Sequence, residues 1–447
     1  MAAEPPKSEV VRCSYVVPNK GRRCRFPVLP GTARCGAHRE DEDDGARIPC
    51  PLDPNHTVFE RRLKQHLKVC TKVRDRSVVE RQPFYHPRIN LPTEDTAASA
   101  SAPPVSAAGA EVVQRWMARI EGVWPKAVEE VLGRDISEQI LEWSVVAHGD
   151  GLAHAEKHEA QNLALAEMML KDRQLSSASQ VVVEFGSGKG GLAAAVLRLR
   201  SARCVLVERE PRRHKFENKQ DAREKQVLRL RLDIADFDLG TFLGSKLGGG
   251  LPKAADLSGG ALSVSAGTNG PAERLEELWR SAAAFQEAGP WPPSSLAACA
   301  KHLCGGATDV ALRSLQACPR GQGLSVCVAT CCHHRCDPDS YVNRRFLERL
   351  GLCDSAEDFR QFVSTAGWAV GGERDLQKKR VGMMSKRILD LGRVAWLREE
   401  LGLEAAIREY ISKAVTPENV VITGRRADAF KASRPARTLL RCLPWCC

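Results

Sequence analysis

The 447-residue sequence contains no long hydrophobic run, and none of its apolar segments approaches the roughly 20 residues that a membrane-spanning helix requires. Its first residues also lack the basic stretch followed by an apolar stretch that marks a secretory signal. The hydrophobic content of 43% and the charged content of 27% are ordinary for a soluble globular chain of about three domains. We therefore expect an intracellular protein of the cytoplasm, the nucleus or both, with no membrane partner.

Acidic residues are absent between Val10 and Arg39, a segment that contains seven basic residues. The first 90 residues hold 18 Lys and Arg against 11 Asp and Glu, and so carry most of the net charge of +11. Such a run is often only a solvated surface, but a basic module on a larger chain favours a polyanionic partner.

The 17 cysteines cluster with histidines, which in an intracellular chain indicates metal binding rather than disulfides. A first cluster, within residues 10–40, has the spacing C-x10-C-x10-C-x2-H and consists of Cys13, Cys24, Cys35 and His38. Its segment has too few apolar residues for a core, so a tetrahedral zinc ion would supply the missing stability. Arginines beside Cys24 suit contact with phosphate.

A second cluster, within residues 47–74, has the spacing C-x5-H-x9-H-x3-C and consists of Cys50, His56, His66 and Cys70. A helix expected over residues 59–70 places His66 and Cys70 on one face, four residues apart. The alternative is a His and a Cys on an ordinary amphipathic helix, but the set of four ligands favours a second zinc finger.

The remaining chain is expected to comprise a linker at 75–110 and an α/β domain at 111–447. Trp116, Ile120, Trp124 and Val128 are spaced for one apolar face of a helix. The glycine-rich segment 240–271 is expected to be a disordered insertion. A helix over 387–411 and a strand over 419–423 should complete the domain.

A buried strand, a glycine turn and a helix are predicted for the stretch VVVEFGSGKGGLAAAVLR, an arrangement that presents bare backbone to a nucleotide-like cofactor. Gly186, Gly188 and Gly191 fit the dinucleotide pattern G-x-G-x-x-G. Glu184, Gly186, Gly188 and Gly190 fit the acidic-glycine pattern of S-adenosylmethionine sites equally well. A tight turn without a ligand is a third interpretation.

Carboxylates follow the next two predicted strands. Glu208 ends the strand 203–208, where it can accept both ribose hydroxyls of an adenosine. Asp233 lies near the end of a third strand predicted over 228–236. Two such acids after a glycine turn support a nucleoside site. On the helix before the turn, His158 and Gln161 are within reach of the cofactor, although a packing role is favoured.

Two further polar elbows follow predicted strands, at the edge where open α/β sheets bind ligands. The first contains Lys301 and His302, and the second is the run from Cys331 to Cys336 with His333, His334 and Arg335. A third metal site within this second run is not favoured, because adjacent cysteines straddle a tetrahedral ion poorly.

In combination, these motifs resemble the eukaryotic tRNA 2′-O-methyltransferases that modify the fourth nucleotide of the acceptor stem. The resemblance rests on both fingers, the turn EFGSGKG at 184–190, the elbow KHLCG at 301–305 and the run CCHH at 331–334. It spans nearly the whole chain apart from the linker, the insertion and the C-terminal tail. The long glycine-rich insertion and the second glycine of Gly305-Gly306 depart from it.

The resemblance implies a Rossmann-like S-adenosylmethionine-dependent methyltransferase domain preceded by two zinc-finger modules, acting on the tRNA acceptor stem. It favours methyl transfer over hydride transfer. The implied cofactor-binding residues are Glu184, Gly186, Gly188, Gly190, Glu208 and Asp233, the last near the adenine.

A ribose hydroxyl is a weak nucleophile, so catalysis should rest on positioning with help in removing one proton. The candidates are Lys301 and His302, with His333, His334 and Arg335 contacting RNA across the cleft. Alternatively, the Lys301 elbow only shapes the cofactor pocket. The rival functions are an RNA-binding scaffold with an inactive methyltransferase fold and a nicotinamide-dependent dehydrogenase.

Overall fold

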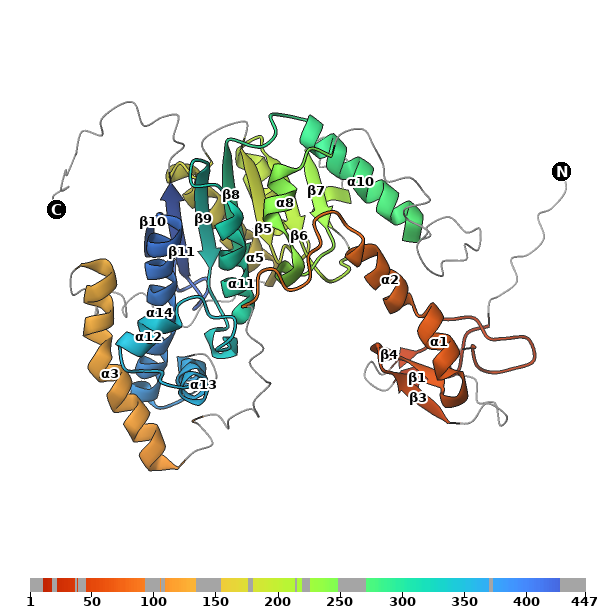
Figure 1. The fold of residues 1–447 in the computed structure, drawn as a ribbon. Helices are drawn as coiled ribbons and strands as arrows, with labels where there is room; N and C mark the ends of the chain where they lie inside the picture. Colours follow the sequence, from red (N-terminus) through yellow and green to blue (C-terminus); the bar gives the residue numbers. More distant parts are fainter. Residues whose placement is uncertain are drawn as a thin grey trace. The chain divides into compact units, whose positions relative to one another are not determined.

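The computed structural model of the chain describes residues 11–17, 22–36, 38, 46–92, 105, 109–133, 154–175, 180–213, 215–218, 226–247, 271–369 and 373–426. The chain divides into a small unit, residues 1–81 with 264–274, and a large unit, residues 82–263 with 275–447 (Figure 1). Within the described ranges, every helix is too short or too polar to cross a membrane.

The small unit is built around cysteines rather than around an ordinary apolar core. A short antiparallel pair, β1 (Val16–Val17) and β2 (Arg22–Arg23), accompanies the first finger. The second finger consists of the hairpin β3 (Arg47–Cys50) and β4 (Asp53–Phe59), the 3-10 turn η3 (Glu60–Arg62) and helix α1 (Leu63–Val69). The buried cluster of the first finger contains its three cysteines, with Tyr15 packed against them.

Part of the segment expected to be a linker, residues 75–110, has regular structure. Helix α2 (Thr71–Glu80) continues the small unit. In the large unit, Phe84 is fully buried and its ring meets that of Phe242 edge to face at 4.9 Å. The Asn90 amide donates to the carbonyl oxygens of Ile234 and Phe237. Residues 93–104 and 106–108 lie outside the described part of the chain.

The large unit contains a seven-stranded sheet of order β10-β11-β9-β8-β5-β6-β7 (Figure 1). The five strands from β9 to β7 are parallel, whereas β11 is antiparallel to both of its neighbours. The strands are β5 (Val181–Phe185), β6 (Arg203–Val207), β7 (Val227–Leu230), β8 (Ser295–Lys301), β9 (Gly323–Ala329), β10 (Glu404–Glu409) and β11 (Val420–Arg426).

The central strands are rich in Val, Leu and Ala and buried on both faces, as expected where helices cover both sides of a parallel sheet. One face packs against α5 (His154–Lys171) and α6 (Gly191–Leu199) through a core that includes Leu165, Met169 and Val196. The other helices are α3 (Ala110–Leu132), α8 (Leu239–Gly244), α10 (Pro271–Glu287), α11 (Gly306–Ser314), α12 (Arg344–Arg349), α13 (Ala356–Thr365) and α14 (Leu376–Leu401).

Several local predictions are confirmed. The predicted apolar face of α3 is buried, and it comprises Trp116, Ile120, Trp124 and Val128. The last strand is present as β11. The insertion expected to be disordered at 240–271 is instead helical at its ends, which contain the end of α8 and the start of α10; its residues 248–270 lie outside the described ranges, so the rest of that expectation stays a prediction.

Two predicted elements are wrong in extent. The helix expected over 387–411 begins instead at Leu376, where the side chain of Asp375 accepts from two amides, and ends before the left-handed Gly402. The strand expected over 228–236 ends at Leu230, because the Asp233 side chain accepts from Ala235 N and caps a 3-10 turn.

Candidate functional site

The order of the parallel strands reverses between β5 and β8, so the chain leaves β5 and β8 in opposite directions across the sheet. Open α/β sheets bind ligands in the crevice at this point, outside the carboxyl ends of the strands. Phe185 pairs with Ala300, which places the glycine turn and the elbow at Lys301 at the same level. The sequence-predicted cofactor turn and catalytic elbow therefore lie next to each other.

The glycine turn has a backbone that side chains disfavour. The φ angles of Gly186, Gly188 and Gly190 are 61°, 54° and 82°. A Cβ at position 186 would lie 2.7 Å from the Leu303 side chain, whereas one at position 188 would meet nothing within 4 Å. The turn thus exposes bare backbone at Gly188 and packs tightly on the Lys301 elbow at Gly186.

Glu184 is buried beneath the turn rather than open to solvent, with 4% of its surface exposed. Its carboxylate accepts from the amide of Ala193 at 2.9 Å and so satisfies the first turn of α6. Burial raises the pKa of Glu184 to about 7, against the opposing effects of that amide and of Arg229 and Lys301. The described contacts therefore give it a role in holding the turn and the α6 amides.

Glu208 follows β6, and its carboxylate accepts from Gly188 N at 2.8 Å and from Glu210 N at 2.9 Å. This carboxylate is thus held against the open part of the glycine turn. Asp233 lies farther along the same edge, 41% exposed, with an oxygen 3.4 Å from Arg209. Glu208 directly follows β6 as predicted, whereas Asp233 lies three residues beyond the end of β7 and not within a strand.

Arg229 is a residue of this site that the sequence analysis missed. From β7, its guanidinium donates to Ser187 Oγ at 3.1 Å and to the carbonyl of Gly188 at 3.0 Å. It also pairs with Glu217. An arginine in the middle of an amphipathic strand gives no sequence signal, because only the fold brings it under the turn.

The Lys301 elbow contacts the helix that precedes the turn. Lys301 Nζ lies 3.3 Å from His158 Nδ1 and 3.4 Å from Gln161 Oε1. Burial lowers the pKa of Lys301 to about 8, and Glu184 opposes this effect. His158 and Gln161, for which a packing role was favoured from the sequence, therefore belong to the surroundings of the candidate base.

His302 forms the tip of this elbow and has a φ of 59°, a left-handed conformation that is uncommon for a residue with a side chain. Its Nε2 lies 3.4 Å from Gln161 Oε1, and its ring meets that of His158 edge to face. Burial of part of the ring and the charge of Lys301 lower the pKa of His302 to about 4. The ring is therefore neutral at physiological pH.

Two side chains near the turn have buried polar atoms without a partner among the described residues, Nε2 of Gln161 and Oδ1 of Asn162. Both come from α5 beside the glycine turn, and Asn162 also approaches Gly191. Buried polar atoms are nearly always paired in folded proteins. A polar ligand at the turn would supply the missing partners, so these residues fit a bound cofactor.

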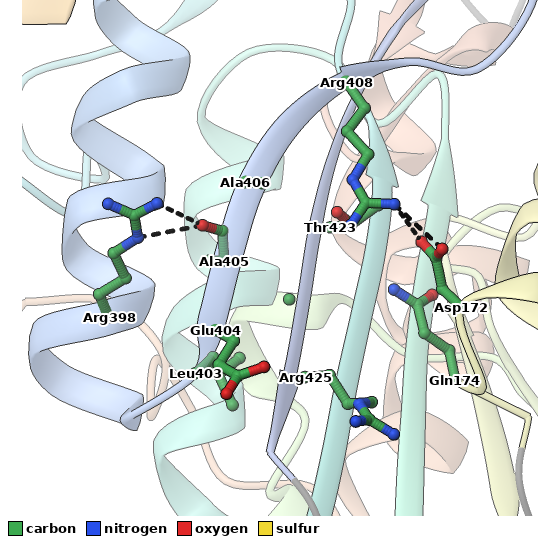
Figure 2. A pocket seen from close by; sticks show the side chains of 11 residues that line it. Asp172, Gln174, Arg398, Leu403, Glu404, Ala405, Ala406, Arg408, Thr423 and Arg425 are labelled. Atoms are coloured by element: carbon green, nitrogen blue, oxygen red, sulfur yellow. Dashed lines mark hydrogen bonds and ion pairs between the residues drawn. The ribbon is translucent and has the colours of Figure 1, made fainter. Parts of the chain in front are cut away.

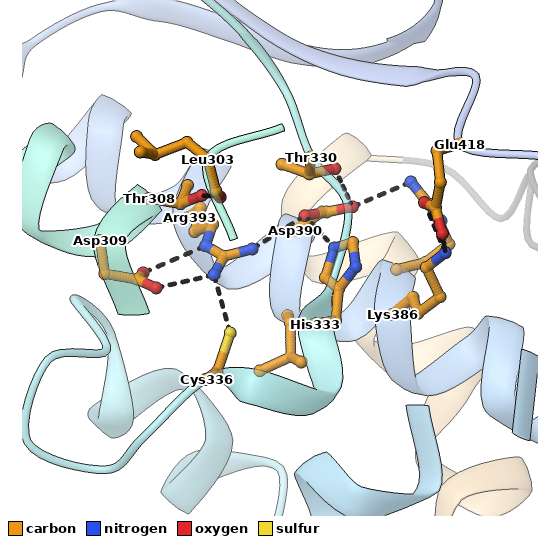
Figure 3. Close-up of polar contacts among 12 residues, drawn as sticks. Leu303, Thr308, Asp309, Thr330, His333, Cys336, Lys386, Asp390, Arg393 and Glu418 are labelled. Atoms are coloured by element: carbon orange, nitrogen blue, oxygen red, sulfur yellow. Dashed lines mark hydrogen bonds and ion pairs between the residues drawn. The ribbon is translucent and has the colours of Figure 1, made fainter. Parts of the chain in front are cut away.

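The second elbow is only partly exposed. His334 and Arg335 are exposed, as expected for residues that contact a substrate. His333 is buried, and its Nε2 lies 2.8 Å from Asp390 Oδ1 (Figure 3). The predicted RNA contact of His333 does not agree with this position, which makes it part of the scaffold.

Figure 3 shows a buried polar network that joins three elements behind the elbows. On α14, Asp390 contacts Arg387 at 2.8 Å and Arg393 at 3.2 Å. Arg393 also forms a bidentate ion pair with Asp309 of α11, in which the two nitrogen-to-oxygen distances are 2.7 and 3.0 Å. The network fixes α11 and the second elbow to α14, and it was not foreseen from the sequence.

A pocket of about 590 Å³ lies elsewhere, beside β10 and β11 (Figure 2). It is lined by Arg398, Arg408 and Arg425 among others, and Arg408 pairs with Asp172 at 2.8 Å. No sequence-predicted site residue lines it. The chemistry of the elbows therefore does not extend into this pocket.

Both predicted ligand sets of the small unit converge, with the ligand atoms of each set within 4.8 Å of one another. In the first finger, Nδ1 of His38 lies 3.6 Å from Cys13 Sγ and 3.4 Å from Cys35 Sγ. In the second, the Sγ atoms of Cys50 and Cys70 are 4.0 Å apart. Such separations fit ligands around one tetrahedral zinc ion.

Solved structures with partial likeness include the plantazolicin methyltransferase BpumL in complex with SAH, with a TM-score of 0.27 and 8% identity over 70% of this chain and 98% of that chain. Coclaurine N-methyltransferase bound to N-methylheliamine and SAH gives a TM-score of 0.24 and 10% identity over 82% and 97%. TM-scores this low carry no argument about the present chain.

Curated relatives match over nearly their full length. The tRNA:m(4)X modification enzyme TRM13 of Eremothecium gossypii is 28% identical over 93% of this chain and 95% of its own. The Homo sapiens homolog of that enzyme is 26% identical over 92% and 94%, and the Saccharomyces cerevisiae enzyme 22% identical over 93% and 96%.

Family comparisons cover all three parts of the chain. The CCCH zinc finger in TRM13 protein matches residues 11–39, and the U11-48K-like CHHC zinc finger matches residues 47–71. The family described as Methyltransferase TRM13 matches residues 160–249, 284–379 and 374–425. The predictions of two zinc fingers and of a methyltransferase α/β fold are confirmed, and the chain belongs to the TRM13 methyltransferase family.

Proposed function

We propose that the protein transfers a methyl group from S-adenosylmethionine to the ribose 2′-hydroxyl of nucleotide 4 in the tRNA acceptor stem. Membership of the methyltransferase family and the names of the relatives, tRNA:m(4)X modification enzymes, support this reaction. The structural observation that carries it is the meeting of the glycine turn and the Lys301 elbow at the switch point of the sheet. A tRNA substrate is in keeping with an intracellular enzyme.

The residues proposed to hold S-adenosylmethionine lie along one edge of the sheet. Gly188 offers open backbone, Gly186 and Gly190 shape the turn around it, and Glu208 offers a carboxylate for the ribose hydroxyls. Asp233 is proposed to lie near the adenine, and Glu184 to support the turn from below. The bound cofactor supplies an electrophilic methyl group, so the protein must mainly align the hydroxyl with it.

Lys301 is proposed as the base that removes the proton of the 2′-hydroxyl. The carbonyl of His158 and Oε1 of Gln161 hold its Nζ in place, and burial lowers its pKa to about 8, which leaves a substantial neutral fraction near pH 8. His302 is proposed to orient the hydroxyl from the adjacent position. Exposed His334 and Arg335 are proposed to contact the RNA backbone.

The zinc fingers are proposed to bind the acceptor stem through its phosphates, because the A-form major groove is too deep and narrow for side chains to read. Three arginines surround Cys24 of the first finger, and all are exposed: Arg22, Arg23 and Arg25. Their replacement by glutamine should weaken tRNA binding and flatten its dependence on salt by about 2 to 3 in log–log slope. Binding of S-adenosylmethionine should not change. An unaltered salt slope would assign the phosphate contacts to another surface.

The direct test is incubation with labelled S-adenosylmethionine and total tRNA, followed by mapping of the methylated nucleotide. Label at the 2′-oxygen of nucleotide 4 is expected, and label at another nucleotide or on a base would refute the proposal. Calorimetry with S-adenosylmethionine separates the enzyme from an inactive RNA-binding scaffold, which would not bind it. Absence of binding to NAD and NADP would exclude the dehydrogenase.

A further inference from the structure

Three cysteines from two separate elbows converge at the carboxyl ends of β8 and β9. Cys304 follows β8, whereas Cys331 and Cys332 follow β9, and the two strands are parallel neighbours that pair Lys301 with Ala329. The Sγ atom of Cys304 lies 3.5 Å from that of Cys331 and 3.2 Å from that of Cys332. All three sulfur atoms lie within 4.8 Å of one another.

This geometry is that of a metal site rather than of a disulfide. Sulfurs bound to one tetrahedral zinc at about 2.3 Å are separated by about 3.8 Å, whereas a disulfide brings two sulfurs to about 2.05 Å. The two finger sites provide an internal comparison, with sulfur separations of 3.9 Å for Cys24 and Cys35 and 4.0 Å for Cys50 and Cys70. The Cys304 sulfur lies closer to those of Cys331 and Cys332 than these finger sulfurs lie to each other.

On their own, the adjacent cysteines Cys331 and Cys332 straddle a tetrahedral ion poorly. The fold removes this objection in two ways. The third sulfur comes from the other elbow, and the backbone turns sharply at Cys332, with φ of −41° and ψ of 59°. Both side chains can therefore face one point.

We propose that Cys304, Cys331 and Cys332 form a third metal site, for a thiophilic ion of the zinc class. Within the described residues, no fourth Cys, His, Asp or Glu joins this group, so the remaining coordination position takes an exchangeable ligand such as water. The ion joins the loop of Lys301 to the loop of His334. The proposal rests on the sulfur geometry and is independent of the RNA substrate.

The partial exposure of the site fits a metal that exchanges its fourth ligand. Cys331 is buried, while Cys304 and Cys332 are half-buried. The site lies at the same edge of the sheet as the proposed catalytic elbow, three residues beyond Lys301. Loss of the ion would free both loops, so the ion acts as a positioning element for the residues on them.

The test measures zinc per chain in the full-length protein, purified under reducing conditions with zinc present and then dialysed. The three clusters predict three equivalents for the wild type and two for Cys304→Ser and for Cys332→Ser. Cys304→His keeps a ligand and should restore the third equivalent. Cys318→Ser removes another buried cysteine that lies outside the clusters, and it should keep all three.

Intact-mass measurement and thiol titration of the same samples separate the remaining outcomes. Two equivalents of zinc in the wild type with three free thiols at these positions would overturn the proposal. Loss of two hydrogens through a bond between Cys304 and either neighbour would also overturn it. If Cys304→Ser does not fold, cobalt substitution of the wild type and of Cys304→His decides, because only a third site adds thiolate-to-cobalt absorption beyond that of the fingers.

Discussion

Asp390 lies at the centre of the buried polar network of the large unit. Its carboxylate is fully buried and accepts from Thr330 at 3.1 Å, besides its contacts with His333, Arg387 and Arg393. Removing one member of a buried ion pair costs about 3–5 kcal/mol, because the remaining charge stays buried without its partner. Arg393 would retain Asp309, but Arg387 would lose its described carboxylate.

We therefore expect Asp390→Ala to lower the free energy of unfolding by about 3–5 kcal/mol, which is roughly a 150-fold to 5000-fold change in the unfolding equilibrium. Urea unfolding followed by tryptophan fluorescence measures this cleanly. All eight tryptophans lie in the large unit, so the signal is free of the zinc fingers.

Glu348→Ala is the matched control. Its exposed pair with Arg344, at 3.9 Å with side chains 45% and 34% exposed, should contribute less than about 1 kcal/mol. An Asp390→Ala protein as stable as the Glu348→Ala protein would refute the reasoning that the network is essential to the fold.

The change with pH of the stability that Asp390 contributes provides a second test. Burial opposes its ionisation, but His333 and Arg387 outweigh burial and hold the pKa of Asp390 well below its usual range. A carboxylate with a depressed folded-state pKa stabilises above its unfolded pKa of about 3.9, and this stability is lost as the pH falls toward the folded value. The stability difference between wild type and Asp390→Asn should therefore be constant above about pH 5 and shrink below about pH 4.

Three further predictions concern the reaction site. Because Lys301 must be neutral to accept a proton, kcat should rise with pH to a plateau above about 8. Lys301→Arg should abolish this rise while leaving cofactor affinity unchanged. A flat wild-type profile of kcat against pH would contradict the prediction. Glu208→Ala should weaken S-adenosylmethionine binding about 10-fold to 100-fold in calorimetry, whereas Glu210→Ala, at a half-exposed neighbour, should not. Gly190→Ala should lower the free energy of unfolding by about 1–3 kcal/mol, because the φ of Gly190 is 82° and a Cβ there would strike the Phe216 ring. In the same thermal melt, the control Gly122→Ala in helix α3 should be neutral or stabilising.

Much of this site could be predicted because its signals are local in sequence. The glycine turn, the acids after β6 and β7 and both finger ligand sets depend on spacings within short segments, and the structure places each where its pattern indicates. The same holds for the apolar face of α3.

What could not be predicted depends on contacts across long stretches of chain. Arg229 comes under the turn only because β7 lies beside β6, and His333 is buried only because Asp390 lies on α14. The third cysteine cluster combines residues 27 and 28 positions apart. The bounds of α14, by contrast, have local signals in the sequence, the N-cap Asp375 and the left-handed C-cap Gly402.

The contact between Leu303 and Gly186 links the two loops of the candidate site. Leu303 occupies the space where a side chain at position 186 would lie, so the loop of the candidate base rests directly on the loop proposed for the cofactor. Movement of either loop therefore changes its contact with the other loop. Linkage then requires reciprocity: the factor by which cofactor changes RNA affinity equals the factor by which RNA changes cofactor affinity. Leu303 is therefore the contact through which binding of the proposed cofactor and of the proposed RNA substrate would be coupled.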